Sequence, residues 1–166
     1  KIEPMHNWYY FKEGFSKKLV DYFIKKYGIK KDSVVLDPFC GVGTTLLTCK
    51  QNGIKSMGFD ISPFFVFVSK VKTRDYNLNV LENDVKKALS WKFERPRELP
   101  SNDFIKKALS QSALEDIVFY NSKINEVEDQ ASKDFLKLAL IYATTMGSWT
   151  VKDGALLRIV KGGRPP

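Results

Sequence analysis

Residues 34–62, VVLDPFCGVGTTLLTCKQNGIKSMGFDIS, contain two short apolar runs that each end at an aspartate. The first run stops at Asp37, before a proline and a pair of glycines, and the second stops at Asp60. Between them a helical pattern begins at Thr44 and ends before Gly53. We therefore predict a strand over 33–38, a helix over 43–52 and a strand over 54–61. Elements in this order form a βαβ unit with parallel strands.

The loop between the first strand and the helix has the composition of a ligand-binding turn. Gly41 and Gly43 permit a sharp turn and let a ligand approach the backbone without a Cβ in the way. The helix that begins at Thr44 offers free N–H groups and the positive end of its dipole. Asp60 follows Gly43 by 17 residues, close to the spacing of acids that accept hydrogen bonds from ribose hydroxyls. Either glycine alone would also fit an ordinary turn, but the whole string favours a ligand.

The same spacing argues against two classes of nucleotide site. Gly43 is followed by Thr44-Thr45-Leu46, so the third glycine of the dinucleotide fingerprint is absent, and so is the G-K-[ST] of a P-loop. What remains is an adenosine-type ligand with little phosphate. The carboxylate of Asp37, at the end of the first strand, suits a ligand that carries an ammonium group.

Helical patterns flank this unit on both sides. A helix follows Ser16, a good N-cap residue, and stops near Gly28. Another begins at Ser62 and Pro63, with proline at the first helical position, and runs to Thr73. The first fifteen residues are rich in aromatic side chains, which are Trp8, Tyr9, Tyr10, Phe11 and Phe15.

Beyond residue 73 the pattern is again mostly helical. We predict a helix over 76–93, a Pro- and charge-rich connector over 94–103, and helical structure throughout 103–147 with Ser132 as a cap. The last helix would carry Phe135, Leu138, Ile141 and Tyr142 on one face, while Trp91 and Trp149 are expected to be core residues within helical patterns. Ala155–Val160 is a possible short strand before a flexible basic end.

Composition indicates a folded domain with a polyanionic partner. The 166 residues are 43% hydrophobic, and the net charge of +8 with a pI of about 9.4 favours nucleic acid over membrane, although a solvated Lys-rich surface also fits. The Lys pairs at 17–18, 25–26, 30–31, 86–87 and 106–107 could form a phosphate track if they converge. No apolar run is long enough to cross a bilayer. Two cysteines and one distant His6 make neither a disulfide framework nor a metal site, so a reducing cytoplasmic setting is expected.

Two strings, DPFCGVGTT at 37–45 and GFDISP at 58–63, closely resemble the S-adenosyl-L-methionine site of the amino-methylating DNA methyltransferases. These enzymes modify the N6 amine of adenine or the N4 amine of cytosine. The segment HNWYYFKEGFSKKLVDYFI at 6–24 resembles the aromatic segment that precedes the glycine loop in part of this family. The resemblance covers about residues 6–73. It implies a Rossmann-like α/β methyltransferase fold, here with an incomplete parallel sheet and a helical extension.

The resemblance also implies roles for individual residues. Asp37 would face the amino group of the cofactor, Asp60 its ribose hydroxyls, and Ile61 with Pro63 its adenine. The helix start at Phe15 and Ser16 would meet its carboxylate. The implied cofactor-binding set is His6, Trp8, Phe15, Ser16, Asp37, Pro38, Phe39, Cys40, Gly41, Gly43, Thr44, Thr45, Asp60, Ile61, Ser62 and Pro63. Within this set His6 could be structural, Phe39 could be a core side chain, and Cys40 reads as a small packing residue rather than a nucleophile.

The catalytic signature of the family, [DNS]-P-P-[YFW], is missing from the sequence. The closest strings are SPFF at 62–65 and RPP at 164–166, and neither fits. The chain could therefore be a fragment, a subunit that takes the motif from a second polypeptide, or a degenerate remnant. We expect a cofactor-binding half at 1–80, a helical insertion or cover at 81–150, and a short strand with a basic linker at 151–166.

The function that this resemblance implies is methyl transfer to an exocyclic amine of a DNA base, of the restriction-modification type. One alternative is an RNA methyltransferase of the tRNA guanine-N2 type, which carries a similar D-P-F-C-G-x-G loop. Another is a cofactor-binding subunit without catalysis. The catalytic residues stay unassigned.

Overall fold

The computed structural model describes residues 3–9, 11, 14–153 and 156–160, and it divides into two compact units. Unit 1 is Lys1–Asp75 and unit 2 is Tyr76–Pro166. The chain is α/β, with mostly helices and one small parallel sheet. None of the described helices is both long and apolar enough to cross a membrane.

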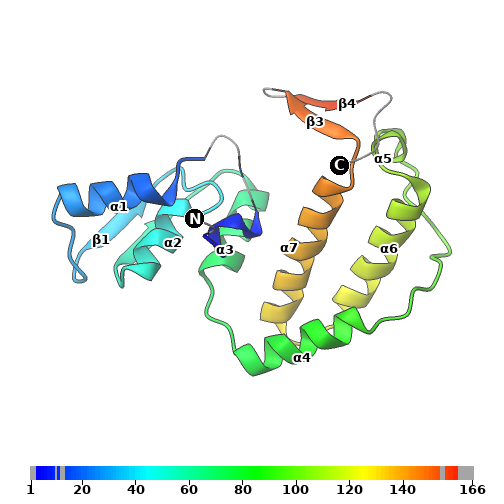
Figure 1. Ribbon diagram of the computed structural model, residues 1–166, viewed down its shortest axis with the longest axis horizontal. Helices are drawn as coiled ribbons and strands as arrows, with labels where there is room; N and C mark the ends of the chain where they lie inside the picture. Colours follow the sequence, from blue (N-terminus) through cyan, green and yellow to red (C-terminus); the bar gives the residue numbers. More distant parts are fainter. Residues whose placement is uncertain (1–2, 10, 12–13, 154–155, 161–166) are drawn as a thin grey trace. The chain divides into compact units, whose positions relative to one another are not determined.

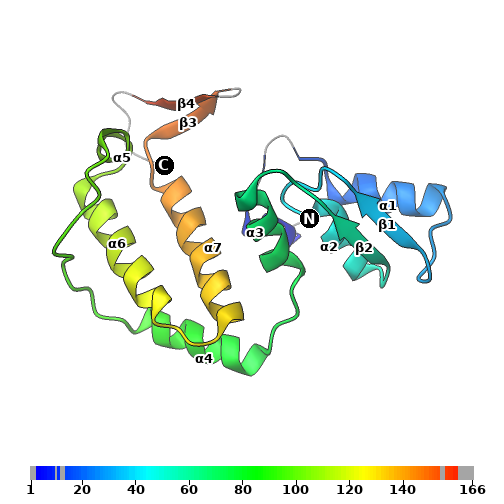
Figure 2. The same ribbon diagram turned by 180° about the vertical axis from the view of Figure 1, so that it is seen from behind.

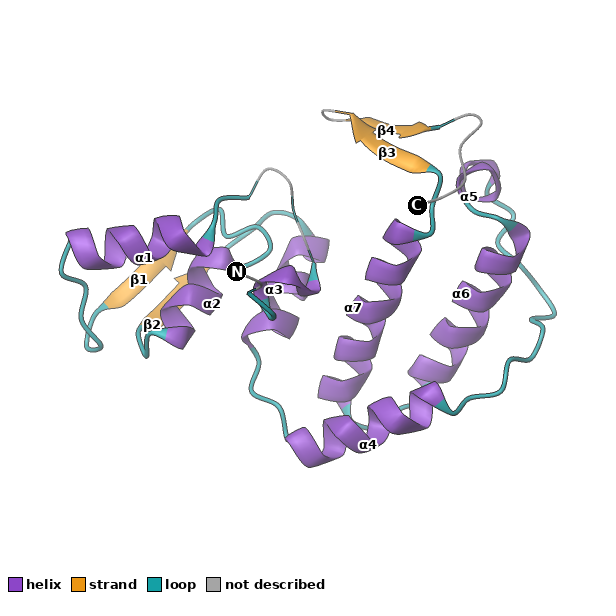
Figure 3. Cartoon of the chain, viewed as in Figure 1, coloured by secondary structure: helices purple, strands orange, loops and turns teal. Residues whose placement is uncertain are grey.

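Unit 1 is built around two parallel strands joined by a helix (Figures 1 and 3). Its elements are a 3-10 helix at His6–Trp8 and then α1 Lys17–Lys26, β1 Val34–Asp37, α2 Thr44–Gln51, β2 Lys55–Gly58 and α3 Pro63–Thr73. The strands pair in register from Val34 opposite Lys55 to Asp37 opposite Gly58. The predicted parallel βαβ unit is therefore confirmed, with both strands shorter than the sequence suggested.

The core of unit 1 lies between the helices, and one face of its sheet is open. Leu47 and Cys49 of α2 and Val68 and Val71 of α3 are at most 1% exposed. Side chains alternate between the two faces of a strand. On the face away from α2, Val34, Leu36 and Met57 are 67%, 59% and 56% exposed. Figure 2 shows this side of the two strands with no helix of unit 1 across it.

Unit 2 is a helical unit that ends in a hairpin. It contains α4 Leu78–Leu89, α5 Asp103–Ala108, α6 Gln111–Asn125, α7 Gln130–Met146, β3 Thr150–Asp153 and β4 Leu156–Ile159. Helices α6 and α7 pack side by side, as Figures 1 and 2 both show, and α4 packs on α7. Ala88, Ile124, Val127 and Leu136 form the buried cluster, and Trp91 packs against it.

The structure corrects several predictions for unit 2. The stretch 103–147 is three helices, not one continuous helical pattern, because Ser110 and Asp129 cap new helix starts. Ser132 is therefore not a cap: it lies inside α7, fully buried, and its backbone N–H donates to the Asp129 side chain at 2.8 Å. Trp91 follows the end of α4 and Trp149 precedes β3, so neither is in a helix.

The end of unit 2 also differs from the prediction. The expected strand is present as Leu156–Ile159, but it pairs antiparallel with β3, which the sequence did not predict. On α7 the buried residues are Ser132, Leu136 and Leu138, while Tyr142 is 40% exposed. Ala155 and the basic end at 161–166 lie outside the described residues.

Candidate cofactor site

The two aspartates that end the apolar runs lie on either side of the glycine loop. Asp60 is tied to that loop, because its Oδ2 accepts a hydrogen bond from the Gly41 N–H at 2.9 Å. Its Oδ1 accepts from the Ser62 N–H at 2.8 Å. Asp37 Oδ1 accepts from the Phe39 N–H at 3.1 Å. Asp37 Oδ2 is buried without a hydrogen-bond partner among the described residues. A buried carboxylate oxygen that lacks a donor is costly, so this atom marks a place where a ligand donor would be stabilising.

Backbone hydrogen bonds continue the strand pairing into the loop. The Phe59 N–H donates to the Asp37 carbonyl at 3.0 Å, and the Cys40 N–H donates to the Phe59 carbonyl at 2.9 Å. The glycine loop is therefore fixed to the end of β2 by its main chain. Both acids and the loop therefore lie at the carboxyl edge of the sheet.

The two glycines of the loop do different things. Gly41 has φ +50° and open space where a Cβ would be, so this is where a ligand can approach the backbone. Gly43 has φ +81°, and a Cβ there would lie 2.5 Å from Ser69 Oγ in α3. Gly43 therefore allows α2 and α3 to pack closely. The sequence argument treated both glycines as ligand-facing, and the structure separates a position with open space, Gly41, from a packing position, Gly43.

Helix α2 begins beside this loop with its N–H groups uncapped. Its N-cap residue is Gly43, which has no side chain, and Thr44 is the first helical residue as predicted. The next residue, Thr45, lines an apolar groove of about 320 Å³ that Phe15 also lines. Helix α3 begins as predicted at Pro63, with the Ser62 hydroxyl accepting from the Phe65 N–H at 3.4 Å.

Several predicted site residues near the glycine loop have exposed side chains. Phe39 is 85% exposed and Ile61 is 100% exposed, and Pro38 is exposed as well. The structure therefore shows that Phe39 is not a core side chain of unit 1. An exposed aromatic and an exposed branched side chain on either side of the glycine loop leave apolar surface for a planar ligand group.

Both cysteines are free and buried. Cys40 is 7% exposed, and burial raises the pKa of its thiol, with Asp37 and Asp60 raising it further. A protonated, buried thiol is a poor nucleophile. Cys40 instead packs under Gly58, where an added Cβ would lie 2.8 Å from Cys40 Cβ. This agrees with the prediction that Cys40 is a packing residue.

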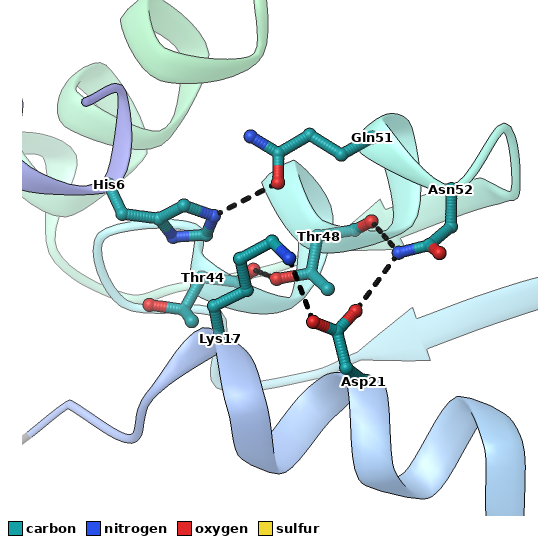
Figure 4. Close-up of polar contacts among 7 residues, drawn as sticks. All are labelled: His6, Lys17, Asp21, Thr44, Thr48, Gln51 and Asn52. Atoms are coloured by element: carbon teal, nitrogen blue, oxygen red, sulfur yellow. Dashed lines mark hydrogen bonds and ion pairs between the residues drawn. The ribbon is translucent and has the colours of Figure 1, made fainter. Parts of the chain in front are cut away.

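The aromatic N-terminal segment is held at the other end of α2. His6 Nε2 lies 3.4 Å from Oε1 of Gln51, the last residue of α2 (Figure 4). Burial lowers the pKa of His6. Trp8 belongs to the same 3-10 helix. The His6 carbonyl accepts from Lys72 in the last turn of α3 at 3.0 Å. The described hydrogen bonds of His6 are thus with the ends of α2 and α3, and not with the glycine loop.

The start of α1 lies beside α2. Ser16 is the N-cap residue of α1, as predicted, but its side chain makes no capping hydrogen bond, and Phe15 is 47% exposed. Lys17 pairs with Asp21 at 2.8 Å, and Asp21 also accepts from Asn52 at 3.1 Å (Figure 4). The contacts of Asp21 hold α1 against the end of α2.

Sequence reasoning missed two buried residues of α3. Ser69 is 4% exposed and faces Gly43, and Lys72 is 2% exposed. Both lie on the helix face that also carries Val68. A lysine on the apolar side of PFFVFVSKVKT was therefore the sequence signal that could have predicted a buried cation.

Comparison with known proteins gives matches to DNA methyltransferases. A family model described as DNA methylase, for N6- and N4-methyltransferases, matches residues 3–71. The type II methyltransferase M.BsoBI of Geobacillus stearothermophilus is 34% identical over 162 residues, which are 95% of this chain and 32% of that protein. M.MjaII of Methanocaldococcus jannaschii is 34% identical over 64% of this chain and 20% of its own length. M.AvaI of Nostoc sp. is 28% identical over 95% of this chain and 34% of its own length.

The matches to M.BsoBI and M.AvaI extend over both units of the chain but over only part of each relative. The chain spans about a third of the length of M.BsoBI and M.AvaI. No solved structure matches it significantly. Three observations point to the same family. The strings DPFCGVGTT and GFDISP resemble its cofactor site, they meet at one edge of the sheet, and the matched relatives are type II methyltransferases. Over these residues the chain is similar to the amino-methylating DNA methyltransferases.

Proposed function

We propose that this chain supplies the cofactor-binding part of an S-adenosyl-L-methionine-dependent DNA methyltransferase of the restriction-modification type. The cofactor supplies an electrophilic methyl group, and the acceptor is the exocyclic N6 of adenine or N4 of cytosine. The observation that carries the proposal is the pair of carboxylates at the glycine loop, one of which keeps a buried oxygen without a donor.

The residues present fit the proposed cofactor. The unpaired Asp37 Oδ2 would accept from its ammonium group. Asp60 accepts from the Gly41 N–H through Oδ2 and from the Ser62 N–H through Oδ1, but each oxygen can accept a second hydrogen bond, so the ribose hydroxyls can add to those contacts. The exposed Ile61 and Pro63 would flank the adenine. Gly41 would let the cofactor approach the backbone.

Other members of the proposed set lie farther from the loop. The α1 start at Phe15 and Ser16 would receive the carboxylate of the cofactor, since uncapped N–H groups at a helix start favour an anion. His6 and Trp8 would act from the aromatic segment. Phe39, Cys40, Thr44 and Thr45 would contribute through the loop and the start of α2.

The larger architecture in this proposal is a Rossmann-like methyltransferase sheet. The two strands would be part of a wider parallel sheet, whose remaining elements would cover the open face at Leu36 and Met57. The [DNS]-P-P-[YFW] motif would lie in the two-thirds of such a protein that this chain does not span, or in a second polypeptide. A cytoplasmic setting goes with this role.

DNA is the proposed partner. Unit 1 has thirteen Lys and Arg residues against seven Asp and Glu residues, so it carries six of the eight net positive charges. That excess suits a phosphate backbone, and binding that depends on it would weaken as salt is raised. Methylation assays on DNA with adenine or cytosine as the acceptor base would assign N6 or N4, and tRNA as substrate would test the RNA alternative.

The decisive experiment compares two ligands in two variants by calorimetry. S-adenosylhomocysteine has the amino-acid group of the cofactor, whereas methylthioadenosine lacks it. Asp37→Asn should weaken S-adenosylhomocysteine binding by roughly tenfold or more and leave methylthioadenosine binding unchanged, because only the former presents an ammonium. Asp60→Asn should weaken both ligands. The control is Asp32→Asn, which changes an exposed acid of the same unit.

Equal losses for both ligands in Asp37→Asn would contradict the assigned orientation. If folded wild-type protein binds neither ligand, the cofactor proposal is wrong.

A further inference from the structure

Lys72 is a buried cation in the last turn of α3. It is 2% exposed, and within the described parts of the chain no carboxylate lies in hydrogen-bonding or ion-pairing reach of its ammonium. Its Nζ donates instead to the Tyr9 carbonyl at 2.8 Å and the His6 carbonyl at 3.0 Å. A buried charge is costly unless it is hydrogen-bonded, so these two contacts are what make the position tolerable.

The segment that Lys72 holds runs along α3 from its last turn to its first. The ring of Tyr9 meets the ring of Phe64 edge-on, with centroids 5.3 Å apart. The ring of Phe11 lies 4.8 Å from that of Phe65. Phe64 and Phe65 are in the first turn of α3, immediately after the residues proposed to flank the adenine. One end of the segment is therefore held by a cation, and the other end reaches the proposed cofactor site through aromatic contacts.

We propose that Lys72 is a positioning residue for cofactor binding, because its ammonium fixes the aromatic segment along α3 and so places Tyr9 and Phe11 beside the adenine end of the site. This inference rests on the proposed function. Lys72 would act through the segment and not by touching the cofactor, since its hydrogen-bonding partners are main-chain carbonyls of residues 6 and 9.

The first test uses the unmodified protein and an amine-acetylating reagent, with labelling of each lysine followed by mass spectrometry. Lys70, which is exposed on the same helix, is the internal reference. Lys72 should react far more slowly than Lys70, because the docked segment covers it. If segment docking favours the cofactor, the cofactor must favour docking by the same factor. Saturating S-adenosylhomocysteine should therefore slow Lys72 labelling by roughly tenfold, the size of one charge-assisted hydrogen bond, and leave Lys70 unchanged.

The second test compares Lys72→Met with Lys70→Met. Methionine keeps much of the apolar stem and removes the donors, so Lys72→Met should weaken S-adenosylhomocysteine binding by roughly tenfold while Lys70→Met does not. Amide hydrogen exchange at Asn7 and Trp8 should accelerate in Lys72→Met, and exchange in β1 and β2 should stay as in the wild type. Lys72→Arg, which retains the charge and the donors, should recover part of the affinity.

These outcomes separate the inference from the function on which it rests. Saturable binding with an unchanged Lys72 labelling rate would overturn the inference and leave the cofactor proposal standing. Wild-type affinity in a folded Lys72→Met protein would do the same. If Lys72→Met does not fold, the labelling result on the wild-type protein decides. Absence of any cofactor binding would overturn both.

Discussion

At the scale of single residues, the glycine loop shows how identical residue types acquire different roles. Gly41 faces open space, whereas Gly43 faces Ser69 across a helix contact. Both have positive φ, so both are conformationally favourable for glycine, but only Gly43 is also sterically required. The D-P-F-x-G-x-G pattern thus combines a glycine that leaves the loop backbone open with a glycine that a helix contact requires.

Gly43→Ala should destabilise the protein by about 1–3 kcal/mol, because the new Cβ meets the Ser69 side chain at 2.5 Å and the backbone has φ +81°. Gly41→Ala should cost about 1 kcal/mol, since its cost comes from the backbone alone. Denaturant unfolding measures both. Ser69→Gly should recover part of the Gly43→Ala loss, and full additivity of the two changes would contradict the proposed contact.

Lys72 should give the protein a specific pH dependence. Burial lowers the pKa of Lys72 to about 8, below the value of 10.5 that applies in the unfolded chain. Between these values the unfolded state binds more protons, so the free energy of unfolding should rise with pH from about 8 to 10.5. The rise should be on the order of 3 kcal/mol. The measurement is the difference in free energy of unfolding between wild type and Lys72→Met as a function of pH, because the titrations of other groups cancel in that difference. A difference that stays constant between about pH 8 and 10.5 would contradict the prediction.

At the scale of elements, helix starts in unit 2 are decided by which of several capping residues is used. Asp129 and Ser132 are both acceptable N-cap types within four residues of sequence. Only Asp129 accepts from a helix N–H, while the Ser132 hydroxyl is buried without a partner among the described residues. The sequence pattern favoured Ser132 because the apolar positions of the helical pattern begin three residues after it, at Phe135.

Asp129→Ala should therefore lower the free energy of unfolding by about 1 kcal/mol, the usual loss on removing an N-cap side chain. Ser132→Ala should be neutral or stabilising, since it removes a buried hydroxyl that lacks a partner. Thermal unfolding of the two variants compares the positions directly. A larger loss in Ser132→Ala than in Asp129→Ala would restore the cap assignment made from sequence.

At the scale of the whole molecule, the notable feature is an incomplete sheet within unit 1. Two parallel strands leave one face with three apolar side chains that are more than half exposed. Parallel sheets in α/β proteins are normally covered on both faces. This open face is consistent with a chain that spans about a third of the relatives it matches.

Replacing the apolar side chains of this face should change surface properties without unfolding the chain. Leu36→Lys and Met57→Lys should lower the binding of a hydrophobic fluorescent dye and change the free energy of unfolding by less than about 1 kcal/mol, because both side chains are exposed. Val151→Lys, at a 47% exposed position in the hairpin of unit 2, is the control and should have little effect on the dye signal. Unchanged dye binding in the sheet variants would show that the face is covered in solution.

The sequence by itself determined the βαβ unit, the positions of both aspartates and the resemblance to the amino-methylating DNA methyltransferases. Local signals carry these features: apolar runs of strand length, a glycine turn, the Ser62-Pro63 helix start and a motif of contiguous residues. Only the tertiary structure decided that Asp37 keeps a buried oxygen without a donor, that Gly43 faces Ser69 and that Lys72 holds the aromatic segment. Lys72 and Tyr9 are 63 residues apart. No local pattern encodes which distant main-chain carbonyl a buried lysine will meet, because that pairing is set by how the helices pack.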